Sequence, residues 1–326
     1  MLHGSDYRVE AVTPPPGTAA LETQGALDDD PLGLVPKLPF VQRYSLDTDH
    51  FEVWLCGSTG YTMNEAIAAL EAATVDYYSA VSNGRYEITF TAGGTTSESF
   101  CLNSITPVGS PEGIFIIDDV TGGGYASPGR VCLDSSNCEW ISSTYPGNDR
   151  YAVIGSGVLN TFPSVATHEL GHTLQWPHSN SGQSEYDNPI DIMSGNSTPG
   201  GWTEARPYGS LAFNRYQSGW VDSSDVIVAA ASYQEVELQP YDAVGTQLIV
   251  VPTIQPGVFY TLGARTSGMH DPIPTAWEGV EVYQVDHDCG QSGFGGLCPG
   301  IWRAQLQEPP NPNGVAHVLQ PGEGIT

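Results

Sequence analysis

The sequence feature that most constrains this chain is the segment 168–178, which reads HELGHTLQWPH. His168 and His172 are four residues apart in a run typical of a helix, so their side chains lie about 40° apart around the helix axis. Both imidazole rings can therefore reach one metal ion from the same face. Glu169 points to the side of that face, where its carboxylate can approach a water on the metal without becoming a ligand. A general base for hydrolysis needs this position.

A third metal ligand is required, because a catalytic zinc site uses three protein side chains and leaves one position open. His178 follows His172 by six residues, beyond a helix end expected at Pro177. We predict that the chain folds back there and that His178 completes the set, since imidazole suits a borderline-soft zinc ion. The loop-like residues 179–182 and Pro189 disfavour the acidic alternatives downstream, which are Glu185, Asp187 and Asp191.

The charge of the chain excludes two classes of partner. Its 326 residues include 37 acidic and 10 basic ones, which gives a formal net charge of -27 at pH 7. Nucleic acids and anionic membrane surfaces require clustered lysine and arginine, so neither is an expected partner. Apolar residues make up 40%, too many for a disordered acidic chain, and no apolar run approaches the roughly 20 residues of a membrane span. The sequence predicts a folded protein without a membrane span and leaves its oligomeric state open.

The six cysteines indicate an oxidising compartment. None of them has the CxxC spacing of a zinc-binding or redox motif, which favours structural disulfides over a zinc–cysteine site. The spacing suggests two short loops and one longer pairing: Cys132 with Cys138, Cys289 with Cys298, and Cys56 with Cys101. We therefore predict a secreted protein.

The pattern along the chain divides it into three parts. Residues 1–39 carry many prolines and a run of three aspartates without hydrophobic periodicity, and we expect an extended lead-in or a propeptide remnant. Residues 40–222 are predicted to form the catalytic domain, with a mixture of helices and strands. Residues 223–326 are predicted to form a small, sandwich-like all-β domain without an obvious closing strand. The fold class is therefore α+β.

Hydrophobic periodicity places the elements of these domains. A capping box from Thr62 to Glu65 opens a helix expected over residues 62–82. The active-site helix is expected to begin at Thr161 or Ser164, either of which can cap it. Short apolar or alternating runs predict strands over residues 51–56, 85–91, 113–117 and 151–155 in the first domain, and over 225–230, 233–238, 247–251, 258–262 and 280–285 in the second.

These motifs resemble those of the metzincin zinc peptidases, whose long motif is HExxHxxGxxH. Met193 resembles the methionine of their Met-turn. The resemblance extends over about residues 51–288 and is strongest from 166 to 195. The sequence is similar to the gametolysin and immune inhibitor A branch at residues 186–194, 213–216, 219–220 and 279–286.

The resemblance implies a zinc endopeptidase with a metzincin-like catalytic domain. Such a domain has a twisted mixed sheet, a backing helix, here at 62–82, and an active-site helix, and a horizontal cleft divides it. The family pattern places Met193 as a hydrophobic floor beneath the zinc ion, where the alternative is an ordinary core methionine. An extended substrate would lie antiparallel to an edge strand, for which residues 151–155 are the candidate.

Two positions depart from the family pattern. Gln175 replaces the glycine at the point where the chain leaves the helix in a left-handed conformation, at a cost of about 1 kcal/mol. Gly195 stands where some metzincins have a tyrosine ligand, so no such ligand is expected. Tyr186 can approach the cleft and stabilise the oxyanion, with a structural aromatic residue as the alternative.

Acidic clusters raise the question of calcium, which commonly stabilises secreted peptidases. Each cluster either supplies calcium ligands or forms a solvated loop. The candidates are Asp118 with Asp119, Asp187 with Asp191, and Asp286 with Asp288.

Taken together, these features predict a secreted zinc-dependent endopeptidase that acts on a protein or peptide, with Glu169 as general base. The alternative is a secreted binding or adhesion module on a peptidase scaffold, with zinc retained for structure. Glu169 argues against it, because a binding module has no use for a carboxylate beside an open metal position.

Overall fold

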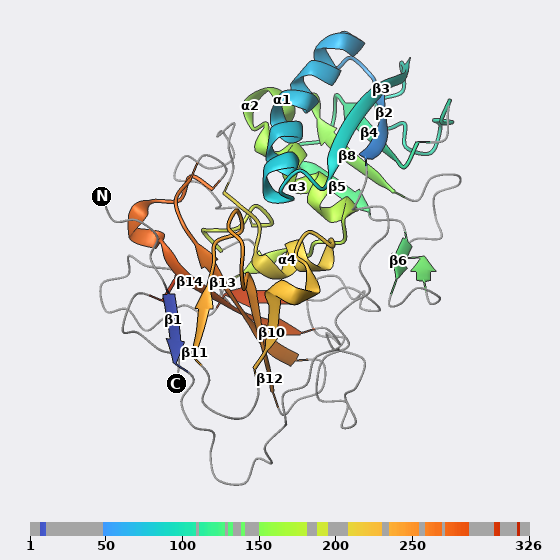
Figure 1. The fold of residues 1–326 in the computed structure, drawn as a ribbon. Helices are drawn as coiled ribbons and strands as arrows, with labels where there is room; N and C mark the ends of the chain where they lie inside the picture. The colour runs from blue at the N-terminus through green and yellow to red at the C-terminus, as the bar shows by residue number, and fades with distance from the viewer. Residues whose placement is uncertain are drawn as a thin grey trace.

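The protein has a mixed fold of helices and sheets (Figure 1). The computed structural model describes residues 7–10, 48–108, 111–127, 130–132, 138–140, 150–180, 188–194, 208–229, 235–253, 258–268, 271–286, 303–306 and 318–319. Within these residues, every helix is too short or too polar to cross a membrane.

The first sheet has five strands in the order β3-β2-β4-β8-β5. Four of them run parallel, and β5 is antiparallel to its neighbour β8. The expectation that residues 151–155 form the edge strand is wrong, because β8 pairs on both sides and β5 occupies the edge. The bounds are β2 (Thr48–Cys56), β3 (Glu87–Thr96), β4 (Gly113–Asp118), β5 (Gly124–Ser127) and β8 (Tyr151–Gly155).

Helices cover one face of this sheet, and α1 packs against α3 (Figure 1). The predicted capping box opens α1, and two hydrogen bonds join the helices. The Tyr78 hydroxyl donates to the Thr167 carbonyl oxygen at 2.6 Å, and the Thr167 hydroxyl donates to the Ala73 carbonyl oxygen at 2.7 Å. The helix at 62–82 is therefore anchored to the helix that carries the histidines. The bounds are α1 (Met63–Val81), α2 (Ser156–Thr161) and α3 (Ser164–Thr173).

The start of α3 differs from the prediction. Pro163 is the N-cap residue and no side chain caps the helix, so neither Thr161 nor Ser164 has the expected role. The amide of Val165 donates to the Phe162 carbonyl oxygen and that of Ala166 to the Pro163 carbonyl oxygen, both at 3.0 Å. Because α2 ends just before, the backbone itself satisfies these first-turn amides.

The opposite face of the first sheet is covered by residues around Cys101, which forms the predicted disulfide with Cys56. Two further strands, β6 (Arg130–Cys132) and β7 (Cys138–Trp140), pair so that Cys132 lies opposite Cys138. A bond between those two cysteines remains a prediction. Cys289 and Cys298 lie outside the described residues.

The second sheet has six strands in the order β10-β12-β13-β14-β15-β9. The bounds are β9 (Ser179–Asn180), β10 (Val226–Val228), β12 (Leu248–Pro252), β13 (Val258–Arg265), β14 (Gly279–Asp286) and β15 (Arg303–Leu306). The remaining elements are α4 (Ala212–Gln217), a 3-10 turn at Ser223–Asp225, another at Thr275–Trp277, and the antiparallel pair β1 (Tyr7–Glu10) and β11 (Glu235–Leu238).

Alternation along β12 explains how this sheet buries both of its faces. Leu248 and Val250 pack in one core with residues of α4, whereas Ile249 packs in a second core with Leu238 of β11. The strand β9 follows directly after His178, so the second sheet includes a strand from the predicted catalytic domain. The division of the chain at residues 222 and 223 remains a prediction.

Candidate metal centre

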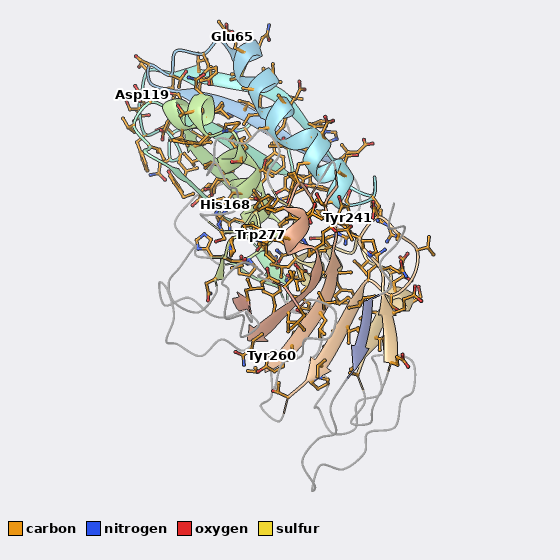
Figure 2. The ribbon with its side chains drawn as sticks, turned by 90° about the vertical axis from the view of Figure 1, so that its left-hand side faces the viewer. Glu65, Asp119, His168, Tyr241, Tyr260 and Trp277 are labelled. Atoms are coloured by element: carbon orange, nitrogen blue, oxygen red, sulfur yellow. A yellow bond between two sulfur atoms is a disulfide. The ribbon has the colours of Figure 1, made fainter. Side chains whose placement is uncertain are left out.

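The imidazole rings of His168, His172 and His178 converge beside the C-terminal half of α3. His168 is labelled in Figure 2. The Nε2 atom of His172 lies 3.0 Å from Nε2 of His168 and 2.8 Å from Nε2 of His178. The ligand atoms of the three side chains all lie within 4.8 Å of one another. Among the residues that the structure describes, no other group of three or more His, Cys, Asp or Glu side chains comes this close. This histidine cluster can bind a metal ion.

Backbone carbonyls fix the tautomers of the two histidines on α3. The Nδ1 atom of His168 lies 2.8 Å from the Ile192 carbonyl oxygen, and Nδ1 of His172 lies 2.8 Å from the Trp176 carbonyl oxygen. A carbonyl oxygen can only accept a hydrogen bond, so both Nδ1 atoms carry the proton. The Nε2 atoms of the neutral rings then present lone pairs.

Burial keeps these rings neutral. It lowers the pKa of His168 to about 3, that of His172 to about 4 and that of His178 to about 2. Two facing lone pairs cannot hydrogen-bond to each other, and a cation between them removes their repulsion. A tetrahedral zinc ion with bonds of about 2.0–2.1 Å to nitrogen separates its ligands by roughly 3.3 Å, so a small outward shift accommodates the ion.

The chain turn after α3 brings His178 back to the site. Gln175 has a φ of 68°, which confirms the left-handed conformation expected at this position. Its amide donates to the His172 carbonyl oxygen at 2.9 Å, and the Trp176 amide donates to the Gly171 carbonyl oxygen at 3.0 Å. These two bonds form a complete Schellman motif. The turn forms with glutamine at the glycine position of the HExxHxxGxxH pattern, and it reverses the chain so that His178 faces the ring of His172.

Glu169 follows His168 on α3 and has a buried carboxylate. Burial raises its pKa to about 8. Its Oε2 atom has no hydrogen-bond partner among the described residues. A nearby cation would lower this pKa and favour the carboxylate, as a general base at neutral pH requires.

The carboxylate of Glu169 lies directly against Gly124 of the edge strand β5. A Cβ atom at position 124 would stand 2.4 Å from Glu169 Oε1, so only glycine admits the carboxylate there. We expect Gly124→Ala to displace Glu169 and to reduce peptide hydrolysis by roughly 10–100-fold. Gly123→Ala is the control, because no atom lies within 4 Å of its added Cβ. Equal activities of the two variants in a peptide assay would contradict this role of Gly124.

Met193 lies on the side of α3 formed by Gly171. The side chain of Met193 is fully buried, and its Sδ atom would stand 2.4 Å from a Cβ atom at position 171. The Ser179 amide also donates to the Met193 carbonyl oxygen at 3.1 Å. Met193 therefore packs against the helix between its two histidines, and a role as the floor of a zinc site remains a proposal.

The contact with Met193 predicts that a methyl group added at Gly171 destabilises the fold. Gly171→Ala is expected to lower the free energy of unfolding by about 1–3 kcal/mol, because the added Cβ overpacks the methionine. Gly157→Ala in α2 meets no atom within 4 Å and should instead stabilise the helix by roughly 0.5–1 kcal/mol. Urea denaturation of both variants measures the difference. A stable Gly171→Ala protein would show that Met193 can move away.

Of the acidic alternatives for the third ligand, only Asp191 lies within the described residues, and it is not brought to the histidines. Asp191 is fully buried, burial raises its pKa to about 7, and it lies outside the group of converging ligand atoms. Glu185, Asp187, Tyr186 and Gly195 lie outside the described residues.

The calcium candidates remain predictions. Asp118 Oδ1 accepts hydrogen bonds from the amides of Val120 and Thr121, and Asp119 Oδ2 accepts one from the amide of Ser58. These carboxylates therefore already stabilise their own loops. Asp288 and Asp187 lie outside the described residues.

The sequence analysis missed three contributors to the site. The carbonyl groups of Ile192 and Trp176 orient the histidine rings, and backbone acceptors are the same for every residue type. Gly124 is the third. Its signal was the run of three glycines at 122–124, since glycine before or in a strand often marks a close approach.

Comparisons with known proteins leave the family of this chain open. No protein-family model matches it, and no curated protein matches it at a significant level. A solved structure to which it is similar is metalloproteinase-II from Bacteroides fragilis, with a TM-score of 0.34 and 17% identity, covering 58% of this chain and 57% of that chain. This chain thus spans little more than half of that protein. This similarity is too weak to support a conclusion about function. The inference about function rests on the geometry of the three histidines.

Proposed function

We propose that this protein is a secreted zinc-dependent endopeptidase. The observation that carries the proposal is the convergence of the Nε2 atoms of His168, His172 and His178, together with the buried carboxylate of Glu169 on the helix that carries the first two. Three imidazoles and an adjacent carboxylate that is not a ligand form the set of groups that metal-assisted hydrolysis uses. The disulfide between Cys56 and Cys101 supports secretion, because such bonds persist in oxidising compartments.

The histidines and Glu169 have different roles in the proposed hydrolysis. His168, His172 and His178 would hold the metal, and a zinc ion bound there would polarise the scissile carbonyl group and lower the pKa of a water molecule. Glu169 accepts the proton of the attacking water and delivers it to the leaving amine. No covalent intermediate with the protein is needed.

The edge strand β5 is the proposed guide for the substrate. It borders the site through Gly124, and it is the last strand in the order of the first sheet. An extended peptide can add to such an edge through backbone hydrogen bonds. This arrangement favours a protein or peptide substrate with an extended segment at the cleavage point.

Cleavage profiling tests the proposal. The purified protein, loaded with zinc, is incubated with a library of unstructured peptides, and products are identified by mass spectrometry. We expect internal cleavage that stops when a chelator removes the metal and returns when zinc is restored. A zinc-loaded protein that cleaves no peptide would favour the binding module with structural zinc.

A further inference from the structure

A cluster of three charged side chains is buried, two of them on strands of the second sheet and the third, Asp271, in the connection between these strands. Arg265 of β13 pairs with Asp271 through two hydrogen bonds, from Nε at 2.6 Å and from Nη2 at 2.7 Å, and with Glu281 of β14 at 2.9 Å. Their side chains are 3%, 1% and 2% exposed, respectively. Buried ion pairs are costly to desolvate, so they are weak evidence for a purely stabilising role.

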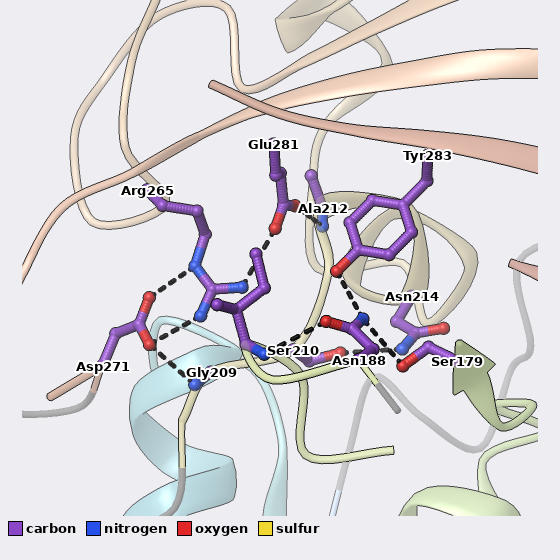
Figure 3. A network of polar contacts seen from close by, with 11 residues as sticks. Ser179, Asn188, Gly209, Ser210, Ala212, Asn214, Arg265, Asp271, Glu281 and Tyr283 are labelled. Carbon is purple, nitrogen blue, oxygen red and sulfur yellow. Dashed lines mark hydrogen bonds and ion pairs between the residues drawn. The ribbon is translucent and has the colours of Figure 1, made fainter. Parts of the chain in front are cut away.

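Both carboxylates of this cluster also hold backbone amides of another segment (Figure 3). Asp271 Oδ1 accepts a hydrogen bond from the Gly209 amide at 2.8 Å, and Glu281 Oε1 accepts one from the Ala212 amide at 3.0 Å. The charged cluster therefore fixes the backbone that leads into α4.

The hydrogen-bonded path continues from this segment to the histidine cluster. The Gly209 carbonyl oxygen accepts from the Ile192 amide at 3.3 Å, and the Ile192 carbonyl oxygen accepts from Nδ1 of His168 at 2.8 Å. Asp271 and His168 are thus joined through two backbone residues, although they are far apart in the sequence. The bond to Ile192 is the one that sets the tautomer and the ring orientation of His168.

We propose that Asp271, held by Arg265, is a positioning residue for the metal centre and acts on His168 through Gly209 and Ile192. The second sheet then orients a metal ligand, which an independent accessory domain would not do. The physical reason is that partners beyond the ligands fix ring orientation, and their loss typically lowers metal affinity by 10–100-fold.

A second contact from the second sheet also supports a positioning role for this sheet at the metal centre. Asn188 donates hydrogen bonds to the Tyr283 hydroxyl of β14 at 2.8 Å and to the Ser179 hydroxyl at 3.0 Å, directly after His178 (Figure 3). Its side-chain oxygen accepts from the Ile190 amide at 3.1 Å. The sheet thus holds the chain beside two of the three histidines.

The proposal rests on the metal site of the proposed function, and zinc affinity tests it without reference to peptide cleavage. Two variants perturb the path. Asp271→Asn keeps the size of the side chain, but its amide group cannot accept from both Arg265 nitrogens. Gly209→Ala removes no polar group, and its Cβ presses on the Asp271 carboxylate, at 3.2 Å from Cγ.

Glu52→Gln is the matched control. Glu52 is also a buried carboxylate that accepts a backbone amide, from Val108 at 2.9 Å, together with the Trp54 ring nitrogen at 2.7 Å. It lies on β2 of the first sheet, and no contact of the path to His168 includes it. A purely structural effect of losing a buried charge should therefore appear in this variant too.

Zinc affinity of the full chain is measured by competition with a chromophoric chelator, well below the melting temperature of each metal-free variant. We expect a 10–100-fold lower affinity for Asp271→Asn, a smaller loss for Gly209→Ala and none for Glu52→Gln. Wild-type affinity in folded Asp271→Asn and Gly209→Ala would overturn the proposal. If Asp271→Asn does not fold, Gly209→Ala decides.

The outcomes also separate this proposal from the proposed function. A wild-type protein that binds zinc but cleaves no peptide overturns the peptidase function, and the affinity ratios still decide the role of Asp271. A wild-type protein that binds no zinc overturns both.

Discussion

Glu169→Gln is expected to reduce peptide hydrolysis by roughly 100- to 10,000-fold while zinc stays bound and the fold is kept. The amide of glutamine can hydrogen-bond to water but cannot accept its proton. Since Glu169 is not among the three converging nitrogen ligands, its substitution leaves the metal ligands in place. Steady-state kinetics on a cleaved peptide, with zinc content measured on the same sample, gives both quantities.

Because Glu169 is buried, Glu169→Gln can remove the general base without destabilising the fold. Burial raises the pKa of the carboxyl group to about 8, so a neutral amide of nearly equal size fits the same environment. We therefore expect the variant to be at least as stable as the wild type in the metal-free state at pH 8. Near wild-type turnover in Glu169→Gln would contradict the proposed general base.

His178→Ala is expected to lower zinc affinity by more than about 100-fold, since loss of a ligand should exceed the loss from its supporting partners. Peptide hydrolysis should fall to background at zinc concentrations that saturate the wild type. Zinc content after dialysis and an activity assay measure the two effects. The reason is geometric, because Nε2 of His178 lies 2.8 Å from that of His172 and no acidic side chain joins the group within the described residues.

The controls for His178 are the acidic residues that the sequence offers as alternatives. Glu185→Ala and Asp187→Ala should bind zinc as the wild type does. A fully loaded and active His178→Ala protein would refute the assignment, and a loss of zinc in one of the two controls would identify the third ligand instead.

The helix that carries His168 and His172 could be predicted because its spacing encodes its geometry. Residues four apart on a helix share a face whatever surrounds it, and the two side chains do converge. Three strands of the second sheet were equally predictable, since β12, β13 and β14 alternate or are continuously apolar between turn residues. The short strands β9 and β15 of the same sheet were not predicted, and residues 179–180 were expected to be loop.

The edge of the first sheet could not be predicted from local patterns. Strand β5 has the sequence GYAS, without the branched or aromatic run that indicates a strand, and its glycine is required by contact with Glu169. The start of α3 was missed for a related reason. Backbone carbonyls of the preceding turn satisfy its amides, so the side chains of Thr161 and Ser164 are not needed as caps.

The path from Asp271 to His168 was also beyond the reach of the sequence. Two of its links are backbone groups, which are present at every residue, and the other residues are widely separated along the chain. Arg265 and Asp271 alone would suggest an exposed pair, because charged residues are mostly found on the surface. Their burial follows from the packing of α4 and the second sheet.

The central claim is that one zinc ion, held by His168, His172 and His178, makes this protein a peptidase. Titration of the metal-free protein with zinc, with hydrolysis of one cleaved peptide as the readout, tests it most directly. The account predicts that activity rises in proportion to added zinc and reaches a plateau at one equivalent per chain. Hydrolysis that is as fast without metal, or a protein that takes up one equivalent and remains inactive towards every peptide in the library, would contradict it.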